Sequence, residues 1–202
     1  LKYIPKILPL NVKEKELYKN KKNLDYVKRA FPGSRINFLH MCNFMSDPSL
    51  IQDILKYDIA IQFDDDSWFY KDPDTSKMKF NKSENKKIIT TSTFTYFKGS
   101  VEKSTDTIKG LFDAIKDFCS KYNIEPRNEL LRESVLKNNE ELFVKLKWAN
   151  GNFNIYETNF FTNKSWYQWI LHIKESGGIY KHRWGDVEVI GAYGYLFYDD
   201  PV

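Results

Sequence analysis

Three consecutive aspartates, Asp64, Asp65 and Asp66, follow an apolar segment, residues 58–63, that is typical of a buried strand. Neighbouring carboxylates repel one another and are costly to desolvate, so a folded protein must offset their charge. Asp64 and Asp66 are two residues apart, which places them on one face of extended backbone. Mn²⁺ and Mg²⁺ bind carboxylate oxygens together with phosphate oxygens. The pattern therefore indicates a metal site that could bridge a diphosphate, with a solvated turn as the alternative.

The segments that precede the aspartates alternate between strand and helix patterns. Apolar residues favour strands at 3–10, 35–42 and 58–63, and helical spacing or capping residues predict helices at 12–31 and 46–57. This β-α-β-α-β order favours a mostly parallel, mixed central sheet flanked by helices. Ligands of open α/β sheets bind outside the carboxyl ends of the strands, which is where the aspartates lie.

The rest of the chain continues the mixed pattern. After a polar, lysine-rich loop, we expect strands at 87–97, 142–148 and 152–161 and helices at 105–121, 126–138 and 165–176. Residues 185–197 are ambiguous, because their valine and glycine content favours a strand while their position favours a helix. No repeat, low-complexity tract or clear linker interrupts the sequence, so we expect a single α/β domain over residues 1–202.

The composition, 42% hydrophobic and 16% aromatic, is sufficient for a sizeable core. The net charge of +4 is spread over lysine-rich helical segments, which weakly favours an anionic ligand, and no known nucleic-acid module is present. The two cysteines, Cys42 and Cys119, are expected to be buried thiols. No apolar run approaches the ~20 residues that span a bilayer, and no signal peptide opens the sequence. These absences favour a soluble cytoplasmic domain over a Golgi-lumenal one.

Two further motifs occur in order with the aspartates. HMCNF occupies residues 40–44, RWGD occupies residues 183–186, and Tyr57-Asp58 precedes the aspartates. Together these residues resemble the H-M-C-R-F, Y-D, E-P-D and R-W-G-D motifs of the fungal Golgi α-1,2-mannosyltransferase family, in which E-P-D is a variant of the Asp-x-Asp (DXD) motif. The resemblance implies a GT-A fold, a GDP-mannose donor and Mn²⁺, with Mg²⁺ as the second choice of metal.

The resemblance covers residues 35–70 and 150–197, and the departure from the family that bears most directly on the reaction is at the position of its nucleophile. The family's proposed nucleophilic glutamate follows an S-N-F pattern, and Asn154 stands there in this sequence. An amide cannot act as a carboxylate nucleophile, so either Glu157 takes this role or the mechanism differs. A retaining reaction would follow the family, whereas an inverting reaction would need Asp186 or Glu157 as the base.

For the aspartates, the resemblance implies that Asp66 is the main metal ligand. Asp64 would share the metal, directly or through water, or contact the ribose and sugar of the donor. Asp65 lies within the donor-binding motif, with its side chain expected to point away from the metal.

Residues outside the aspartate motif supply the remaining candidates. Asp186 could orient the acceptor hydroxyl or act as a general base, or it could be the N-cap of a helix. Arg183 could pair with a phosphate, and Trp184 could either stack on a sugar or pack in the core. His40 and Asn43 are donor-binding candidates at the end of an expected strand, although a histidine in an apolar strand is more often a core residue.

The expected function is metal-dependent transfer of a hexose from a nucleotide-diphosphate sugar to a glycan or glycoprotein acceptor. GDP-mannose is the donor by resemblance, and a UDP-sugar is the second choice. Residues 1–100 would form the nucleotide-sugar and metal-binding half of the domain, and residues 101–202 the acceptor half. The alternative is a nucleotide-sugar- or carbohydrate-binding domain without turnover, in which Asn154 marks lost chemistry.

Overall fold

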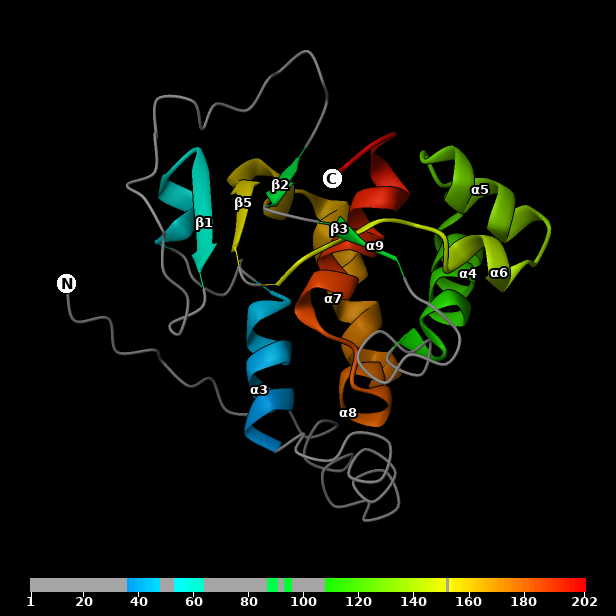
Figure 1. The fold of residues 1–202 in the computed structure, drawn as a ribbon, viewed down its shortest axis with the longest axis horizontal. Helices are drawn as coiled ribbons and strands as arrows, with labels where there is room; N and C mark the ends of the chain where they lie inside the picture. Colours follow the sequence, from blue (N-terminus) through cyan, green and yellow to red (C-terminus); the bar gives the residue numbers. More distant parts are fainter. Residues whose placement is uncertain (1–35, 48–52, 64–86, 91–92, 96–107, 152) are drawn as a thin grey trace.

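The computed structural model describes residues 36–47, 53–63, 87–90, 93–95, 108–151 and 153–202. In Figure 1 a small sheet lies at the left, a group of helices from the C-terminal part of the chain lies in the centre, and a second helical group lies at the right. The order of elements mixes strands and helices, so the α/β class expected from the sequence is confirmed.

The larger described sheet has the strand order β1 (Ile59–Phe63), β5 (Phe153–Glu157) and β2 (Ile88–Thr90). Strand β5 is central, and both of its pairings are antiparallel, so the expected parallel pairing is not seen among the described strands. The strands expected around 58–63 and 152–161 are present in shortened form. Their pairing joins segments far apart in the sequence, which local β-α-β order does not encode.

Residues 35–42 were expected to form a strand, and this prediction is wrong, because residues 36–42 belong to helix α3 (Ile36–Met45). Leu39, Cys42 and Ser46 are all buried, and their spacing of three and four residues matches one face of a helix. A short apolar run carries no periodicity that separates a buried strand from a buried helix, which explains the error. The helix that was expected next is described only in part, as the 3₁₀ turn η2 (Ile54–Lys56).

The helices expected at 105–121 and 126–138 are confirmed as α4 (Leu111–Tyr122) and α5 (Glu129–Leu136). The strand expected at 142–148 is wrong over most of its length. Asn139 accepts hydrogen bonds from the backbone N–H groups of Glu141 and Leu142, and this cap starts the short helix α6 (Glu140–Phe143). Only β4 (Trp148–Ala149) is extended, and it pairs with β3 (Thr93–Phe94).

The C-terminal part of the chain forms three helices. Helix α7 (Lys164–Ser176) was expected, and the Asn163 side chain caps it by accepting a 2.8 Å hydrogen bond from the Trp166 N–H. Helix α8 (Gly178–His182) follows after Gly177. The ambiguous segment 185–197 is helix α9 (Asp186–Phe197), which is buried along most of its length.

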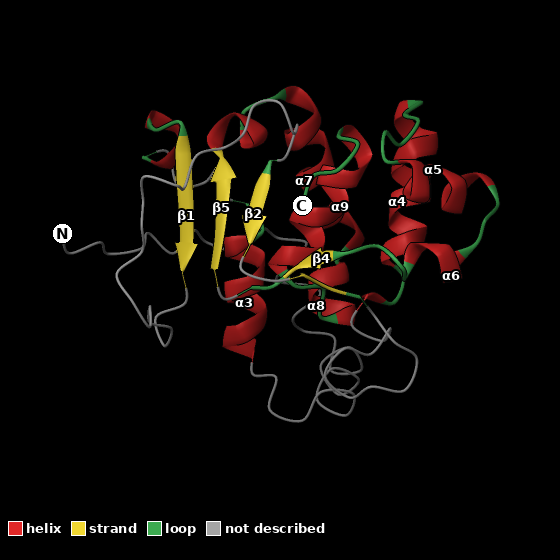
Figure 2. Cartoon of the chain, turned by 45° about the horizontal axis from the view of Figure 1, so that its top comes forward, coloured by secondary structure: helices red, strands yellow, loops and turns green. Residues whose placement is uncertain are grey.

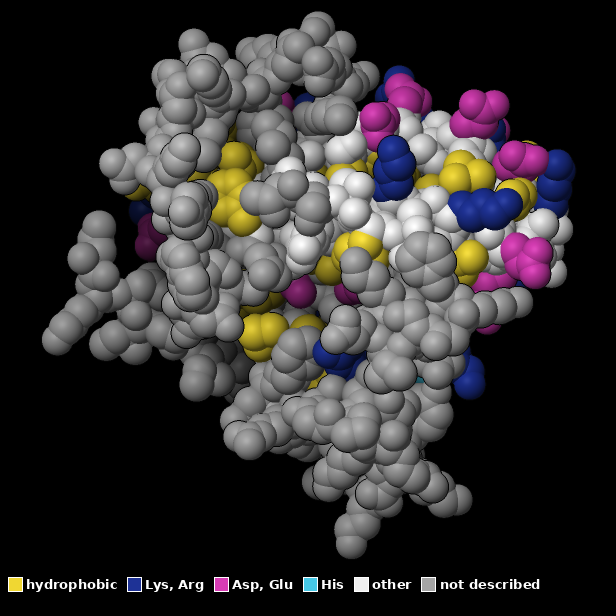
Figure 3. Space-filling model, in the orientation of Figure 1, with side chains coloured by type: hydrophobic (Ala, Val, Ile, Leu, Met, Phe, Trp, Pro, Cys, Tyr) yellow, Lys and Arg dark blue, Asp and Glu magenta, His cyan; other side chains and the backbone are white. Residues whose placement is uncertain are grey.

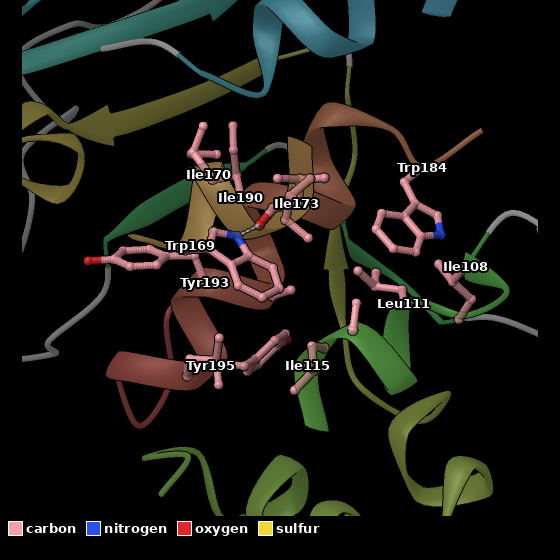
Figure 4. Packing of buried hydrophobic residues seen from close by; sticks show 14 of the residues in the cluster. Ile108, Leu111, Ile115, Trp169, Ile170, Ile173, Trp184, Ile190, Tyr193 and Tyr195 are labelled. Carbon is pink, nitrogen blue, oxygen red and sulfur yellow. Dashed lines mark hydrogen bonds between the residues drawn. The ribbon is translucent and has the colours of Figure 1, made fainter. Parts of the chain in front are cut away.

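Helix α9 connects the two sides of the molecule. Figure 2 shows α7 and α9 between the sheet of β1, β5 and β2 and the group of α4, α5 and α6. A helix in this place must be apolar on almost every side, which is why its sequence resembled a buried strand. The Trp169 indole of α7 donates a 2.9 Å hydrogen bond to the Val189 carbonyl of α9, drawn as a dashed line in Figure 4.

The outer surface of the α4–α6 group is charged. In Figure 3 lysine, arginine, aspartate and glutamate side chains alternate along the right edge, where these helices lie. At the C-terminal end of α5, Lys137 and Glu133 form an exposed ion pair, with 2.5 Å between Nζ and Oε1. Within the described part of the chain, no helix is both long enough and apolar enough to cross a bilayer.

Candidate functional site

The aspartates that dominate the sequence pattern, Asp64, Asp65 and Asp66, lie outside the described residues. Strand β1 ends at Phe63, immediately before them in the chain. Among the residues that the structure does describe, no three His, Cys, Asp or Glu side chains gather in a cluster that could hold a metal ion. The geometry of the site therefore starts from the end of β1 and its neighbours.

Asp186 lies beside the last residues of β1. The side-chain amide of Gln62 donates a 2.8 Å hydrogen bond from Nε2 to Oδ2 of Asp186, and Tyr156 of β5 donates a 2.8 Å hydrogen bond to Oε1 of Gln62. Asp186 is the first residue of α9, and the N-cap position expected for it is occupied by Gly185. The structure thus places the candidate base beside Gln62, which precedes the first aspartate of the motif, Asp64, by two positions in the sequence.

Helix α3 packs against the same end of α9. The buried Cys42 thiol is close to the backbone N–H of Asp186 and to the charges of Asp186, Glu188 and Arg183. Burial raises the pKa of Cys42, and the two carboxylates raise it further. Burial also raises the pKa of the Tyr156 phenol, with Asp186 as the second cause. Both groups therefore stay neutral, and neither is an activated nucleophile.

Asn154 is completely buried in the centre of the sheet. It lies opposite Gln62 of β1 and Thr90 of β2 in the strand register. Tyr156 lies two residues further along β5 on the same face of the sheet and is close enough to interact with the Asn154 amide. Even so, no described group meets hydrogen-bond geometry with Oδ1 or Nδ2 of Asn154. Buried amides without partners are rare and costly, and they often mark a site that is completed by a ligand or water.

Glu157 lies at the other end of β5. Glu157 pairs with Ile59 in the strand register, whereas Asn154 pairs with Gln62. The side chains of Glu157 and Asn154 therefore point to opposite faces of the sheet. Its carboxylate forms a 2.5 Å ion pair with Lys87, and both side chains are largely buried. The structure therefore does not bring Glu157 together with Asn154 and Asp186.

We expect Glu157→Gln to lower the free energy of unfolding by about 1–2 kcal/mol, because Lys87 would keep a weaker partner in a largely buried place. We expect turnover of a nucleotide sugar to stay within about threefold of wild type. Urea unfolding and donor hydrolysis would measure the two effects. Glu133→Gln is the matched control, since it breaks an exposed pair of the same length and should leave stability unchanged. A loss of turnover in Glu157→Gln without a loss of stability would assign Glu157 a catalytic role.

The other candidates from the RWGD and HMCNF motifs have structural contacts. The Trp184 side chain is 2% exposed and its indole N–H donates a 2.9 Å hydrogen bond to the Lys109 carbonyl, which favours the core-packing alternative. Figure 4 shows its ring facing Ile108 and Leu111. His40 on α3 is 3.2 Å from the Tyr180 hydroxyl on α8.

The two remaining donor-binding candidates are more open to solvent. Asn43 on α3 and Arg183, which follows α8, are half-buried. Arg183 has a positive φ of 63°, so the chain turns sharply there before it enters Trp184 and α9. After this turn, Asp186 lies within hydrogen-bond distance of Gln62 on β1.

The structure adds Gln62 and Tyr156 to the candidates, and the sequence analysis missed both. Gln62 carried a signal that could have been used, because it is polar within an apolar strand and shares the strand's alternation with Asp64. Next to these two side chains lies a cavity of about 160 Å³, with largely apolar walls. It is lined by Phe44, Met45, Ile54, Ala60, Ile61, Gln62 and Tyr156.

Comparison with solved structures identifies proteins with the same fold. Core-mannan synthase A (CmsA/Ktr4) from Aspergillus fumigatus, solved in its Mn/GDP-form, superposes with a TM-score of 0.73 at 19% identity over 97% of this chain and 54% of that one. The mannosyltransferase Ktr4p from S. cerevisiae, solved in complex with GDP, superposes with a TM-score of 0.64 at 20% identity over 97% of this chain and 49% of that one.

Sequence comparison leads to the same group of proteins. The chain is 27% identical over 188 residues to the probable mannosyltransferase KTR3 of Saccharomyces cerevisiae, a match that covers 92% of this chain and 43% of KTR3. The chain thus spans about half the length of these relatives. Residues 5–200 match the family described as glycolipid 2-alpha-mannosyltransferase. The resemblance noted in the sequence is confirmed, and the chain belongs to the glycolipid 2-alpha-mannosyltransferase family.

Proposed function

We propose that this chain is a metal-dependent mannosyltransferase that uses GDP-mannose as its donor and a glycan or glycoprotein as its acceptor. Family membership supports the reaction class, and the Mn/GDP-form and GDP complex of the structural relatives support the ligands. The observation that carries the proposal is the contact between Gln62 and Asp186, because it brings a carboxylate from α9 to the end of β1, after which the three aspartates follow in the sequence.

Asp64 and Asp66 would hold the metal, with Asp65 between them in the donor-binding motif. Their carboxylate oxygens suit Mn²⁺ or Mg²⁺, and the Gln62–Asp186 contact places a further carboxylate near the end of the preceding strand. When bound, such an ion would stabilise negative charge on the diphosphate leaving group. Arg183 is the described cation nearest in sequence to Asp186 and would pair with a donor phosphate.

Asp186 would act on the acceptor. Its carboxylate would accept a hydrogen bond from the acceptor hydroxyl and either orient it or take its proton as the hydroxyl oxygen attacks the sugar. Asp186 lies in the first turn of α9, where the helix dipole interacts favourably with negative charge. Asn154 cannot form a carboxylate ester with the sugar, and its unpartnered buried amide would instead hydrogen-bond a polar group of the ligand.

A second candidate function is binding of the nucleotide sugar without turnover. The observation that favours it is again Asn154, because a neutral amide stands where the family resemblance places a nucleophilic carboxylate. His40 and Asn43 on α3 would serve as donor contacts in either case. The two functions differ in whether free nucleotide is released.

The decisive experiment is a panel of GDP- and UDP-sugars incubated with the protein in Mn²⁺ and in EDTA, with free nucleotide as the readout. We expect slow hydrolysis of GDP-mannose that requires Mn²⁺ and is lost in EDTA. Metal-dependent binding of GDP-mannose without release of GDP would favour the binding function. Hydrolysis of a UDP-sugar alone would change the donor, and absence of both binding and hydrolysis would overturn the proposal.

A further inference from the structure

The function proposed above assigns no chemical role to Gln62, although Gln62 is the side chain through which β1 contacts Asp186. Both the nitrogen and the oxygen of its side-chain amide form hydrogen bonds. Nε2 donates to the Asp186 carboxylate at 2.8 Å, and Oε1 accepts from the Tyr156 hydroxyl at 2.8 Å. The three residues come from β1, β5 and α9, so the contact joins elements that are far apart in the sequence.

The direction of this chain of hydrogen bonds is set by chemistry. An ionised carboxylate can only accept, so Gln62 must turn its NH₂ group toward Asp186. Its carbonyl oxygen then faces Tyr156, and a carbonyl can only accept, so the phenol must donate. The phenol keeps its proton, because burial and the nearby Asp186 charge raise the pKa of Tyr156. The Asp186 carboxylate, which can only accept, thus sets the orientation of the Gln62 amide, and the Tyr156 hydroxyl holds its oxygen in place by donating to it.

We propose that Gln62, held by Tyr156, is a positioning residue that fixes the orientation of the Asp186 carboxylate for the acceptor. The inference rests on the proposed function. A carboxylate on the first turn of a helix can rotate about two side-chain bonds, and a hydrogen bond to one oxygen restricts that rotation. A base must meet its hydroxyl within hydrogen-bond distance, so loss of this orientation lowers turnover without removing the base.

Several other groups face Asp186, and the test must separate their effects from that of Gln62. Cys42 of α3 and Tyr156 of β5 both interact with Asp186, and the charges of Arg183 and of Glu188 on α9 act on the same Cys42 thiol. None of them changes in Gln62→Met, which keeps nearly the same volume and removes both hydrogen bonds. Tyr156→Phe removes the hydroxyl that donates to Gln62 and leaves both partners of the Gln62–Asp186 hydrogen bond unchanged.

The first measurement is the pKa of Asp186 in the metal-free full chain. It is obtained from a pH titration of the NMR signals of ¹³C-labelled aspartate carboxyl groups. The Asp186 signal is assigned as the one that disappears in Asp186→Asn. We expect Gln62→Met to raise this pKa by about one unit, because a donor to the ionised form is lost. Tyr156→Phe should raise it by less. Tyr193→Phe is the matched control: it also removes a buried tyrosine hydroxyl, one that is 2.7 Å from Asn163 Oδ1, and it should leave the Asp186 pKa unchanged.

The second measurement is steady-state release of GDP from GDP-mannose in Mn²⁺. We expect Gln62→Met to lower kcat about tenfold, with KM within about twofold of wild type, and Tyr193→Phe to change neither. An unchanged Asp186 pKa in Gln62→Met would overturn the inference, as would a shifted pKa with an unchanged kcat. Absence of binding and turnover in the wild type would reject the proposed donor and the assigned use of Asp186. The pKa comparison needs no donor, so it would still decide whether Gln62 orients the carboxylate.

Discussion

Asp66→Ala is expected to lower Mn²⁺-dependent release of GDP from GDP-mannose by about 100- to 1,000-fold, because a carboxylate that holds the metal supplies several kcal/mol of charge stabilisation. The expectation follows from the sequence, in which Asp66 comes three residues after the end of β1 as the last aspartate of the motif. Titration of activity with Mn²⁺ would show whether the variant binds the metal more weakly or turns over more slowly when the metal is saturating.

Asp65→Ala is the control for Asp66→Ala. It removes an equal charge from the same run of aspartates, but its side chain is expected to point away from the metal. We expect it to keep the requirement for Mn²⁺. Neither change should destabilise the fold, because each removes one of three neighbouring carboxylates that repel one another. Metal-dependent turnover in Asp66→Ala at the wild-type rate would exclude this residue as the main ligand and favour a solvated turn.

Gly178→Ala is expected to lower the free energy of unfolding by about 3 kcal/mol, because the new methyl group would overlap the Trp184 ring. A Cβ atom at this position would lie 2.1 Å from Cζ3 of Trp184, well inside van der Waals contact. The ring cannot move away easily, since it is 2% exposed and its indole N–H is bonded to the Lys109 carbonyl. Urea unfolding followed by tryptophan fluorescence would measure the change.

Gly151→Ala is the matched control, because a Cβ there meets only Cγ1 of Val187 at 3.8 Å. We expect this variant to stay within about 0.5 kcal/mol of wild type. The double variant Gly178→Ala/Trp184→Leu should be more stable than the sum of its single changes predicts, since leucine frees the space that the methyl group needs. Equal stabilities of Gly178→Ala and Gly151→Ala would show that α8 can shift away from Trp184.

The packing of Trp184 against Gly178 also shows that not every residue of the RWGD motif serves ligand binding. Trp184 packs under Gly178 and fixes the turn that starts α9, whereas Asp186 emerges from that turn toward β1. One tryptophan and one aspartate in the same short motif therefore serve packing and the candidate site respectively. Sequence spacing alone could not separate the two roles, because both residues are compatible with sugar binding.

Local chemistry in the sequence was sufficient for several features. The family resemblance, the α/β class, the strand before the aspartates and the helices at 105–121 and 165–176 all follow from motifs, periodicity and capping residues, which act over a few positions. The two buried thiols, Cys42 and Cys119, were also predictable from their apolar surroundings. These features depend on neighbours in the chain, so they can be read without the fold.

Tertiary contacts decided the features that depend on distant residues. Whether residues 36–45 form a strand or a helix, whether β1 pairs parallel or antiparallel, and whether Glu157 or Gln62 accompanies Asp186 were settled by packing across the domain. An apolar run carries the same composition in either conformation, and its partner supplies the energy that selects one. The sequence alone therefore identified the family and the acidic motif, while only the folded chain brought Asp186, Gln62 and Tyr156 together.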